Sequence, residues 1–230
     1  GDGGEDAEAD NALAAQWYSA SRDYWEGATA DVSGMLGGLG TLHQVDVSAS
    51  LALLDGLRAH QAAPLPQGIA LDCGAGIGRV SSAVLLERFD AVELLEPNAR
   101  FLETARTQLP PSRLRATHES GLQDFIPPAG KAYAAVWVQW VLNYLKDADL
   151  TSFLRRCAAA LTPGGRIIIK ESVSRQGKGF FVDRSDASIT RTDAHFRMLF
   201  AAAGLRVMHT EMQPGLPRAV FPVCMYVLHL

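Results

Sequence analysis

The stretch that decides the fold is IALDCGAGIGRVSSAVL, residues Ile69–Leu85. An apolar run over 69–73 leads into three glycines at alternate positions, and apolar residues at helical spacing follow them. A buried strand, a glycine turn and a helix are the elements with which parallel α/β sheets hold a nucleotide-like ligand. Because glycine has no Cβ, Gly74, Gly76 and Gly78 let the backbone approach such a ligand closely. A glycine-rich turn with a purely structural role is the alternative.

Strand and helix patterns alternate after this stretch, which predicts crossover connections and a mostly parallel sheet. The last two predicted strands have no helix between them, so they must pair antiparallel. The predicted fold class is therefore α/β: a seven-stranded, mostly parallel, Rossmann-like sheet with an antiparallel final strand and helices on both faces. Strands are expected at 69–73, 91–96, 114–118, 133–140, 166–171, 205–213 and 223–230, and helices at 80–88, 100–108, 149–161 and 193–203.

The chain is expected to have three parts. Residues 1–10 are acidic and glycine-rich and are expected to be disordered. Residues 11–66, which carry apolar and aromatic side chains at helical spacing, are expected to form a helical extension that acts as a lid. Residues 67–230 form the predicted core, with a substrate loop near 172–190.

Composition excludes several classes of function. The 230 residues carry a net charge of -4 and are 48% hydrophobic, which fits one globular domain and gives no basic field for nucleic acid. No apolar run is long enough to cross a bilayer, so no membrane partner is expected. Scattered cysteines and unpaired histidines predict no disulfide framework and no metal site. A reducing compartment is expected.

The sixth position of the glycine stretch discriminates between cofactors. A dinucleotide fingerprint has glycine or alanine there, whereas this chain has Arg79. A guanidinium pairs with a carboxylate, and S-adenosylmethionine combines an adenosine with a carboxylate. Glu96 ends the second strand, immediately before Pro97, where an acid accepts the ribose hydroxyls. Glu93 is interpreted as a solvated or salt-bridged strand position.

Segments after the third and fourth strands complete the predicted cofactor site. The loop SGLQDF, residues 120–125, is expected to cover the adenine, with hydrogen bonds from the Gln123 side chain and the Leu122 backbone. A surface amide is the alternative for Gln123. Trp140 ends the fourth strand, where the methyl group should lie, and either walls a substrate pocket or belongs to the core.

Several motifs together resemble one family, the protein N-terminal alpha-amine methyltransferases, which methylate exposed X-Pro-Lys amino termini. The similarity covers nearly everything after the acidic start, and it is carried by MLGG, LDCGAGIGR, GLQDF, VQWV, FLRRC, LTPGG and VDRSDAS. The resemblance implies a class I methyltransferase that uses S-adenosylmethionine, releases S-adenosylhomocysteine and acts on proteins or peptides beginning X-Pro-Lys. A monomer in the cytoplasm or nucleus is expected.

The resemblance also implies roles for matched residues. Trp140 would pack on the substrate proline, and Asp183 and Asp186 would receive the substrate lysine and amino end. Tyr144 and Phe221 would wall the pocket, where the family often has histidine and tyrosine. The implied cofactor contacts are Gly74, Gly76, Arg79, Glu96, Leu122, Gln123, Gln139 and Trp25, and the implied substrate contacts are Tyr24, Trp140, Tyr144, Asp183, Asp186 and Phe221.

Two residues are assigned to the chemistry. An α-amine has a pKa of about 7.7 to 8, against about 10.4 for lysine, so it needs only modest help to lose its proton. Asp186 is the predicted base, although on spacing alone Asp183 and Asp186 are an ordinary solvated loop pair. Ser172 stands where the family usually carries asparagine, so one hydroxyl replaces a longer amide.

Other functions stay open at this point. A methyltransferase of the same fold that acts on a small molecule is one alternative. A protein that binds the cofactor without catalysis is another, prompted by Ser172. A nicotinamide-dependent dehydrogenase is disfavoured by Arg79.

Overall fold

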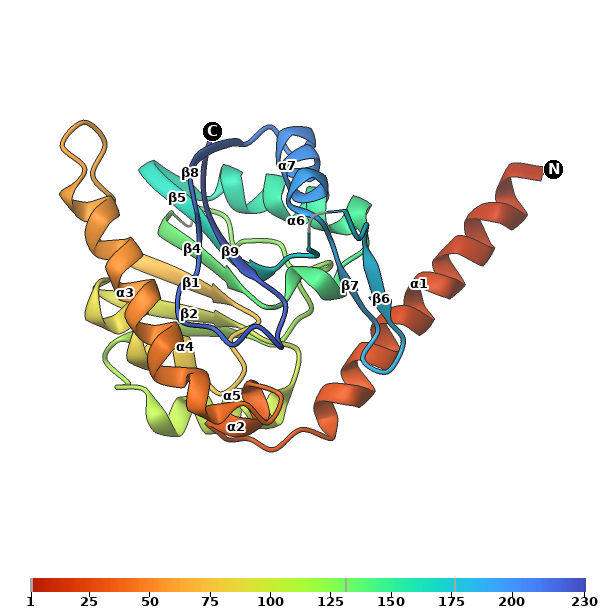
Figure 1. The fold of residues 1–230 in the computed structure, drawn as a ribbon, viewed down its shortest axis with the longest axis horizontal. Coiled ribbons are helices and arrows are strands. Elements are labelled where there is room, and N and C mark those ends of the chain that lie inside the picture. The colour runs from red at the N-terminus through yellow and green to blue at the C-terminus, as the bar shows by residue number, and fades with distance from the viewer. Residues whose placement is uncertain (1, 131, 176) are drawn as a thin grey trace.

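The computed structural model describes residues 2–130, 132–175 and 177–230, with side chains from residue 12 onward. Its main sheet has seven strands in the order β3-β2-β1-β4-β5-β9-β8 (Figure 1). The pairs among β1 to β5 are parallel, whereas β9 is antiparallel to both β5 and β8. The predicted fold class is confirmed. The strands are β1 (Ile69–Cys73), β2 (Ala91–Leu95), β3 (Leu114–His118), β4 (Tyr133–Gln139), β5 (Leu161–Ser172), β8 (Arg206–Met212) and β9 (Val223–His229).

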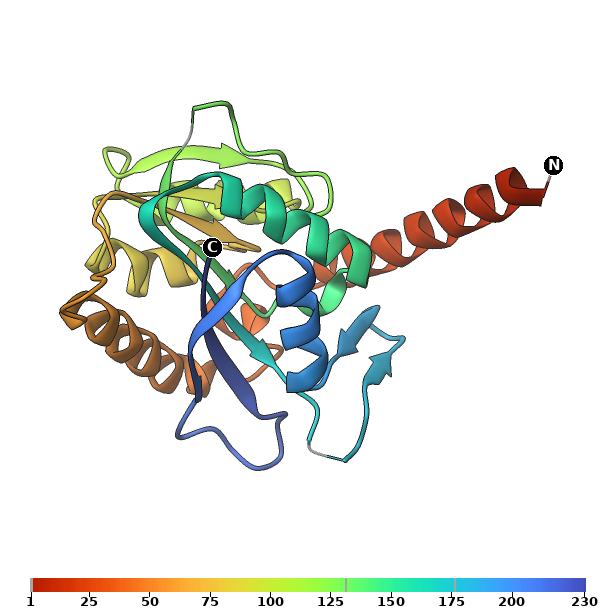
Figure 2. The ribbon, with the colours of Figure 1, turned by 90° about the horizontal axis from the view of Figure 1, so that it is seen from above.

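Helices cover both faces of the sheet (Figures 1 and 2). Side chains of α3 (His43–Ala59), α4 (Arg79–Ala83) and α5 (Ala99–Gln108) share one apolar cluster with one face. Side chains of α6 (Asp147–Ala159) and α7 (Asp193–Ala202) share a second cluster with the other face. Alternate residues of each strand therefore belong to different clusters, as a sheet that is buried on both sides requires.

The N-terminal region consists of α1 (Asp2–Glu26), α2 (Val32–Met35) and the 3-10 helix η1 (Gly40–Leu42). In place of the disorder predicted for residues 1–10, residues 2–10 form the first turns of α1, and Gly1 lies outside the described residues. Alanine and glutamate are strong helix formers, and negative charge is favoured at a helix N-terminus. The division into three parts stays a prediction.

The second half of α1 is attached to the core. Trp17 Nε1 donates to the backbone carbonyl of Tyr144 at 2.9 Å. The hydroxyl of Tyr18 donates to Asp149 Oδ2 at 2.5 Å. These bonds hold the helix beside the carboxyl end of β4, where the sequence places the ligand site.

Several boundaries differ from the prediction. The helix expected at 80–88 divides into α4 and the 3-10 helix η2 (Leu85–Glu87), because Val84 leaves the helical region with φ -127°. The expected substrate loop contains a small hairpin, β6 (Phe181–Asp183) paired with β7 (Ser188–Thr190). Another 3-10 helix, η3 (Leu142–Tyr144), follows β4.

Within the described residues, no helix combines the length and the apolar character that crossing a bilayer requires. The same part of the chain holds no group of three or more histidine, cysteine, aspartate or glutamate side chains arranged for a metal ion. The three cysteines are buried and free.

Candidate active site

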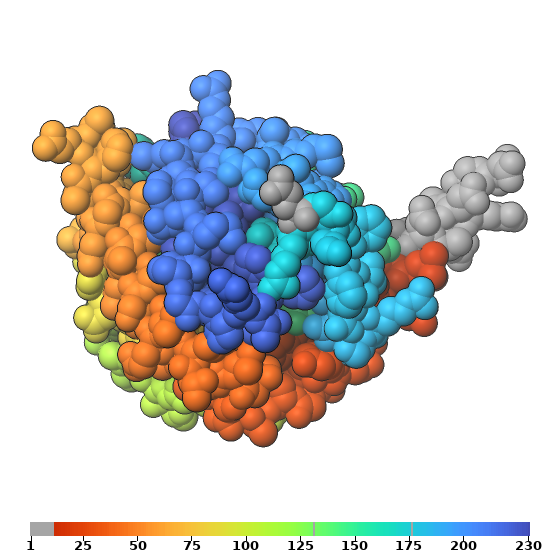
Figure 3. All heavy atoms as spheres, in the orientation of Figure 1, coloured from red at the N-terminus to blue at the C-terminus, as the bar shows by residue number. Residues whose placement is uncertain are grey.

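A cavity of about 480 Å³ lies at the carboxyl ends of the parallel strands. Its walls come from the N-terminal helices, the ends of β1, β2, β4 and β5, the β6–β7 hairpin and residues 216–223. Figure 3 shows N-terminal, hairpin and C-terminal segments meeting on one face of the molecule. All sequence-predicted site residues line this cavity: Tyr24, Trp25, Gly74, Gly76, Arg79, Glu96, Leu122, Gln123, Gln139, Trp140, Tyr144, Ser172, Asp183, Asp186 and Phe221. Their individual roles stay predictions.

The glycine turn lies where β1 ends. Gly74 and Gly76 have φ values of 68° and 53°, in the region that disfavours other residues. A Cβ on Gly74 would lie 2.8 Å from the Val141 side chain, and one on Gly76 would lie 2.5 Å from Met35 Sδ. Both glycines are therefore required by packing and also line the cavity.

Glu96 is held rigidly at the end of β2. Its Oε2 accepts from the Gly76 N–H at 3.0 Å, and its Oε1 accepts from the Asn98 N–H at 2.9 Å. Burial raises the pKa of Glu96 to about 7, against the lowering effect of these two N–H groups. Each carboxylate oxygen keeps a lone pair, so Glu96 can still accept hydroxyl groups from a ligand.

Asp72 is a second carboxylate in the cavity wall, and the sequence analysis missed it. It is the fourth residue of β1, just before the glycine turn, and its Oδ2 accepts from the backbone and hydroxyl of Ser81 at 3.1 and 2.7 Å. Burial raises the pKa of Asp72 to about 6. The signal was present, because the aspartate belongs to the LDCGAGIGR motif itself.

A buried ionic group, here called the Asp46 cluster, joins α3 to the cavity. Asp46 Oδ2 lies 2.7 Å from Arg79 Nη1, and Asp46 Oδ1 lies 2.5 Å from Lys170 Nζ. Gln139 Nε2 donates to both carboxylate oxygens of Asp46, at 2.9 and 3.0 Å. Asp46 and Lys170 are 0% exposed. Although burial would raise the pKa of Asp46, Lys170 and Arg79 hold it below its ordinary value.

The cluster has two consequences for the site. With its groups ionised it carries two positive charges and one negative charge, so its net charge favours an anionic ligand group beside Arg79, which lines the cavity. The amide of Gln139 is already engaged, since its Oε1 accepts from Trp137 Nε1 at 3.0 Å. Gln139 therefore belongs to the frame that supports Arg79.

Trp140 has an unusual backbone. Its φ is 53°, a left-handed conformation that a residue with a side chain adopts only at a free-energy cost of about 1–2 kcal/mol. The Trp140 N–H donates to the carbonyl of Lys170 at 3.0 Å, and the ring centroid lies 5.7 Å from the Arg79 guanidinium carbon. The indole lines the cavity and is only partly buried, so it is not an interior core residue.

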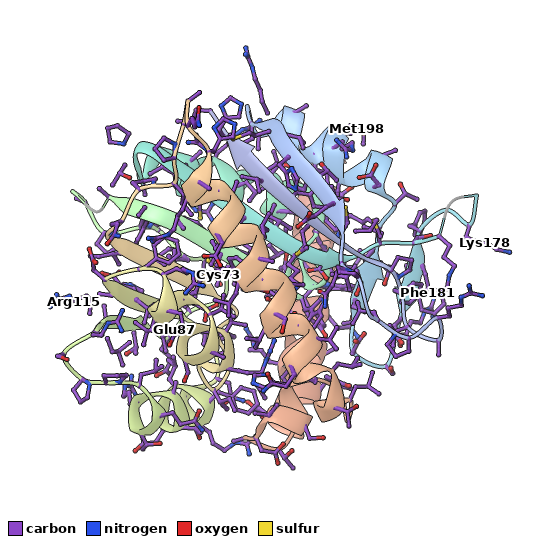
Figure 4. All side chains as sticks on the ribbon, turned by 60° about the vertical axis from the view of Figure 1, so that its left-hand side comes forward. Cys73, Glu87, Arg115, Lys178, Phe181 and Met198 are labelled. Carbon is purple, nitrogen blue, oxygen red and sulfur yellow. The ribbon has the colours of Figure 1, made fainter. Side chains whose placement is uncertain are left out.

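Aromatic rings form another part of the cavity wall. The rings of Tyr24 and Trp25 meet edge to face at 5.5 Å, and those of Trp25 and Tyr144 at 6.0 Å. Phe221 lies further out, with its centroid 5.9 Å from that of Phe181. In Figure 4 Phe181 projects from the hairpin away from the central sheet.

The two predicted substrate carboxylates differ in environment. Asp183 Oδ1 accepts from the backbone and hydroxyl of Ser185 at 2.8 and 2.6 Å, and these bonds lower the pKa of Asp183. Asp186 Oδ2 accepts from the Tyr144 hydroxyl at 3.4 Å. Asp186 Oδ1 is buried and has no hydrogen-bond partner among the described residues. Asp186 therefore holds a free acceptor at the cavity wall, which an ordinary solvated loop aspartate does not.

A buried group at the end of β5 surrounds Ser172. Glu171 accepts from the backbone N–H groups of Ser172 and Leu142 at 2.9 and 3.0 Å, and from Asn143 Nδ2 at 3.2 Å. Burial raises the pKa of Glu171 to about 7. Neither Glu171 nor Asn143 was selected from the sequence, although both line the cavity.

Hydrogen bonds from Arg156 hold the loop of residues 120–125, which is predicted to cover the adenine. Arg156 donates to the carbonyls of Leu122 and Phe125 at 3.0 and 2.7 Å. Gln123 Nε2 donates to Asp124 Oδ2 at 2.8 Å while its side chain lines the cavity. Glu93, expected to be a solvated or salt-bridged strand position, is fully buried, and its Oε2 lies 2.9 Å from His118 Nε2 and accepts from the Tyr133 hydroxyl at 2.8 Å, so of the two alternatives the structure has the paired one.

Asp46 and Asp193 lie in the first turns of α3 and α7, and neither is the N-cap of its helix. Asp46 lies inside the first turn of α3, where it forms the buried cluster. The N-cap of α7 is Thr192, whose hydroxyl accepts from the His195 N–H, so the helix begins at Asp193, one residue earlier than it would with Asp193 as the cap. Asp193 instead accepts from Tyr226 at 2.8 Å.

Comparison with known proteins places these residues in context. The family described as AdoMet dependent proline di-methyltransferase matches residues 14–229. Alpha N-terminal protein methyltransferase 1 of Arabidopsis thaliana is 40% identical over 234 residues, which cover 97% of this chain and 83% of that protein. N-terminal Xaa-Pro-Lys N-methyltransferase 1 of Danio rerio is 36% identical over 209 residues, covering 90% and 92%. A solved SAM-dependent methyltransferase of Leishmania major has a TM-score of 0.84 at 37% identity, covering 92% of this chain and 82% of that one.

Proposed function

This chain belongs to the AdoMet-dependent proline di-methyltransferase family, and we propose on that premise that it methylates the α-amino group of proteins whose N-termini read X-Pro-Lys. The observation that carries the proposal is a single cavity that joins a cofactor-type glycine turn and Glu96 to the unpartnered oxygen of Asp186. The Danio rerio relative, whose name specifies Xaa-Pro-Lys, supports the substrate class.

The residues present fit S-adenosylmethionine. Glu96 offers carboxylate oxygens to ribose hydroxyls, and the Asp46 cluster offers net positive charge to the methionine carboxylate. Leu122 and Phe101 supply apolar surface for the adenine ring. The volume of about 480 Å³ is that of a small-molecule site. When bound, this cofactor supplies a methyl group on a sulfonium, and S-adenosylhomocysteine is the product.

The substrate side fits a proline followed by a lysine. Proline has no N–H to donate, so a pocket recognises it by packing, and the aromatic wall at Trp140 and Tyr144 provides the surface. The carboxylates of Asp183 and Asp186 line the same cavity and suit a lysine ammonium and an amino terminus.

The chain's own groups then act by orientation and by accepting a proton. A neutral α-amine uses its lone pair to form the new N–C bond, the S–C bond breaks with its electrons passing to sulfur, and one N–H proton must leave. Asp186 Oδ1 is a buried acceptor for that proton, directly or through water. Most of the rate acceleration comes from alignment of the amine with the methyl group.

Mass spectrometry of X-Pro-Lys peptides tests the proposal. Incubation of the protein with S-adenosylmethionine and Ala-Pro-Lys or Ser-Pro-Lys peptides should add whole methyl groups to the α-amine, whereas N-acetylated peptides should stay unchanged. Transfer to small amines without transfer to the peptides would indicate a small-molecule methyltransferase. Tight cofactor binding by calorimetry without any turnover would indicate a non-catalytic binding protein.

We also propose that the protein acts as a monomer in a reducing location, the cytoplasm or the nucleus. The buried, unpaired cysteines support a reducing location. Burial raises the pKa of the Cys73 and Cys157 thiols, which keeps them unreactive. Sedimentation of the purified protein and microscopy of a tagged copy test the two parts separately.

A further inference from the structure

Asn143 lies beside Ser172, the serine at the position where the family usually carries asparagine. Asn143 Nδ2 lies 3.3 Å from the carbonyl oxygen of Ser172 and 3.2 Å from Glu171 Oε1. Asn143 belongs to η3, after β4, whereas Ser172 ends β5. The Asn143 side chain lines the cavity and the residue is 6% exposed. An amide is therefore present next to position 172, delivered from a neighbouring element.

The partners of Asn143 fix the orientation of its amide. Both the Ser172 carbonyl and the Glu171 carboxylate are acceptors, so the amide nitrogen must face them. The amide oxygen Oδ1 then faces away from them, and it is buried without a hydrogen-bond partner among the described residues. Buried acceptors are rarely left unpaired, so this atom points to a donor that arrives with a ligand.

A second unpartnered oxygen belongs to a neighbouring element. Asp186 Oδ1 is also buried and lacks a partner in the described part of the chain. Asp186 lies in the turn between β6 and β7, β7 packs against η3, and Asp186 Oδ2 accepts from the hydroxyl of Tyr144, the residue after Asn143. Two free acceptors on segments joined in this way suit a ligand group with two N–H donors, and a neutral α-amine has two.

We propose that Asn143 is a substrate-binding residue of this chain, and that its amide oxygen, with Oδ1 of Asp186, accepts the two N–H groups of the substrate α-amine. This inference rests on the proposed function. Asn143 thereby supplies, from η3, an amide beside position 172, where the family usually carries asparagine. With both N–H directions fixed, the amine lone pair has one direction left, toward the methyl group.

A neutral acceptor has an advantage at this position. A carboxylate beside the amine favours the ammonium form, which cannot attack a methyl group. An amide oxygen orients the amine without adding a second negative charge to that of Asp186. The pair of one charged and one neutral acceptor therefore binds the amine while opposing its deprotonation less than two carboxylates would.

The test measures whether Asn143 and the substrate amine interact. Peptide binding to the protein loaded with S-adenosylhomocysteine is measured by calorimetry for Ala-Pro-Lys and for the propionyl-Pro-Lys analogue, which has hydrogen in place of the amine. The wild type should bind Ala-Pro-Lys more tightly than the propionyl analogue, and Asn143→Ala should reduce this ratio of affinities about tenfold. Gln213→Ala is the matched control, because Gln213 is also a buried amide with unpartnered atoms but lies outside the cavity wall. Its amine preference should equal the wild type's.

Two further variants keep the test independent of folding and test the link to Ser172. The double variant Asn143→Ala with Ser172→Asn should recover part of the turnover that Asn143→Ala alone loses, because position 172 then supplies an amide. A tenfold gain from Ser172→Asn alone would overturn the inference, because the site would then lack an amide.

The inference would also be overturned if Asn143→Ala left the preference for the amine-bearing peptide unchanged. In that case, methylation of X-Pro-Lys peptides by the wild type would still support the proposed function. If the wild type neither binds nor methylates these peptides, the proposed function fails and the inference fails with it.

Discussion

Replacing Asp46 by asparagine tests a group of buried charges that joins α3 to the sheet. The substitution keeps the shape of the side chain and removes the negative charge that Arg79 and Lys170 share, at 2.7 and 2.5 Å. Lys170 is 0% and Arg79 is 7% exposed, so water cannot replace the lost carboxylate. One asparagine amide presents its N–H₂ group where a carboxylate oxygen faced a cation.

The expected loss of stability is large. Removing one partner of a buried ion pair costs about 3–5 kcal/mol, because the remaining charge stays buried without compensation. For a chain of this size each kcal/mol shifts the melting temperature by about 2–4 °C, so Asp46→Asn should melt about 6–20 °C below the wild type. Asp55→Asn is the matched control on the same helix. Asp55 binds Arg88 at 2.6 Å with its side chain 56% exposed, and such solvent-screened surface pairs contribute little to stability, so Asp55→Asn should melt close to the wild type.

Thermal melts across pH give a second check. The pKa of Asp46 is lowered on folding, so its ionisation stabilises the protein above its unfolded pKa of about 3.9, and that stability is lost as pH falls through the folded value. The difference in melting temperature between the wild type and Asp46→Asn should therefore be largest near neutral pH and should decrease only in acid. Equal melting temperatures for Asp46→Asn and Asp55→Asn at neutral pH would refute the reasoning, because the cluster would then not be an ionic one.

Asp186→Asn should lower turnover on X-Pro-Lys peptides about 100-fold or more while cofactor affinity stays within threefold of the wild type; a collapse of cofactor binding in calorimetry would show that the role is misassigned. Cofactor binding should weaken about tenfold between pH 8 and pH 6, because Glu96 accepts hydroxyls best when ionised and its pKa is about 7, and Glu96→Gln should bind weakly at both pH values; equal wild-type affinity at the two pH values contradicts this. Gly74→Ala should lose about 2–5 kcal/mol in urea unfolding, since its φ is 68° and the new methyl would lie 2.8 Å from Val141; an unchanged urea midpoint would mean that the turn relaxes freely.

Local periodicity was sufficient to predict the main sheet. Its central strands β1, β2 and β4 are mostly apolar runs, and the two last strands pair antiparallel as expected. The hairpin β6–β7 was missed because its strands are three residues long and β6 is mostly exposed, with Phe181 50% and Val182 39% accessible. Such short strands carry no burial period that a sequence could reveal. The start of β5 was misplaced for a related reason, since its TPGG segment was interpreted as a helix end.

The cavity residues next to motifs could be located from the sequence, but the Asp46 cluster could not. Lys170 interrupts the isoleucine run of a central strand, and such a lysine requires a buried counter-charge. The sequence could therefore have indicated that Lys170 has a buried partner. It could not indicate which residue that partner is, because Asp46 lies 124 positions away and only the packing of α3 on the sheet brings the two together. Asn143 could not be selected from the sequence either, because its role in our proposal depends on an amide oxygen that its neighbours in the folded chain leave without a partner.

The charges of the cavity match the charge that the proposed reaction moves. The Asp46 cluster gives the end beside Arg79 a net positive charge, whereas Asp183 and Asp186 line the wall with negative charge. Methyl transfer removes a positive charge from sulfur and places it on the amine nitrogen. In the arrangement that we propose, that nitrogen faces Asp186, whose free oxygen is buried and therefore interacts strongly with charge that develops beside it. Asp186 thus stabilises the transition state more than the neutral amine, so its electrostatic effect assists the transfer even before it accepts the proton.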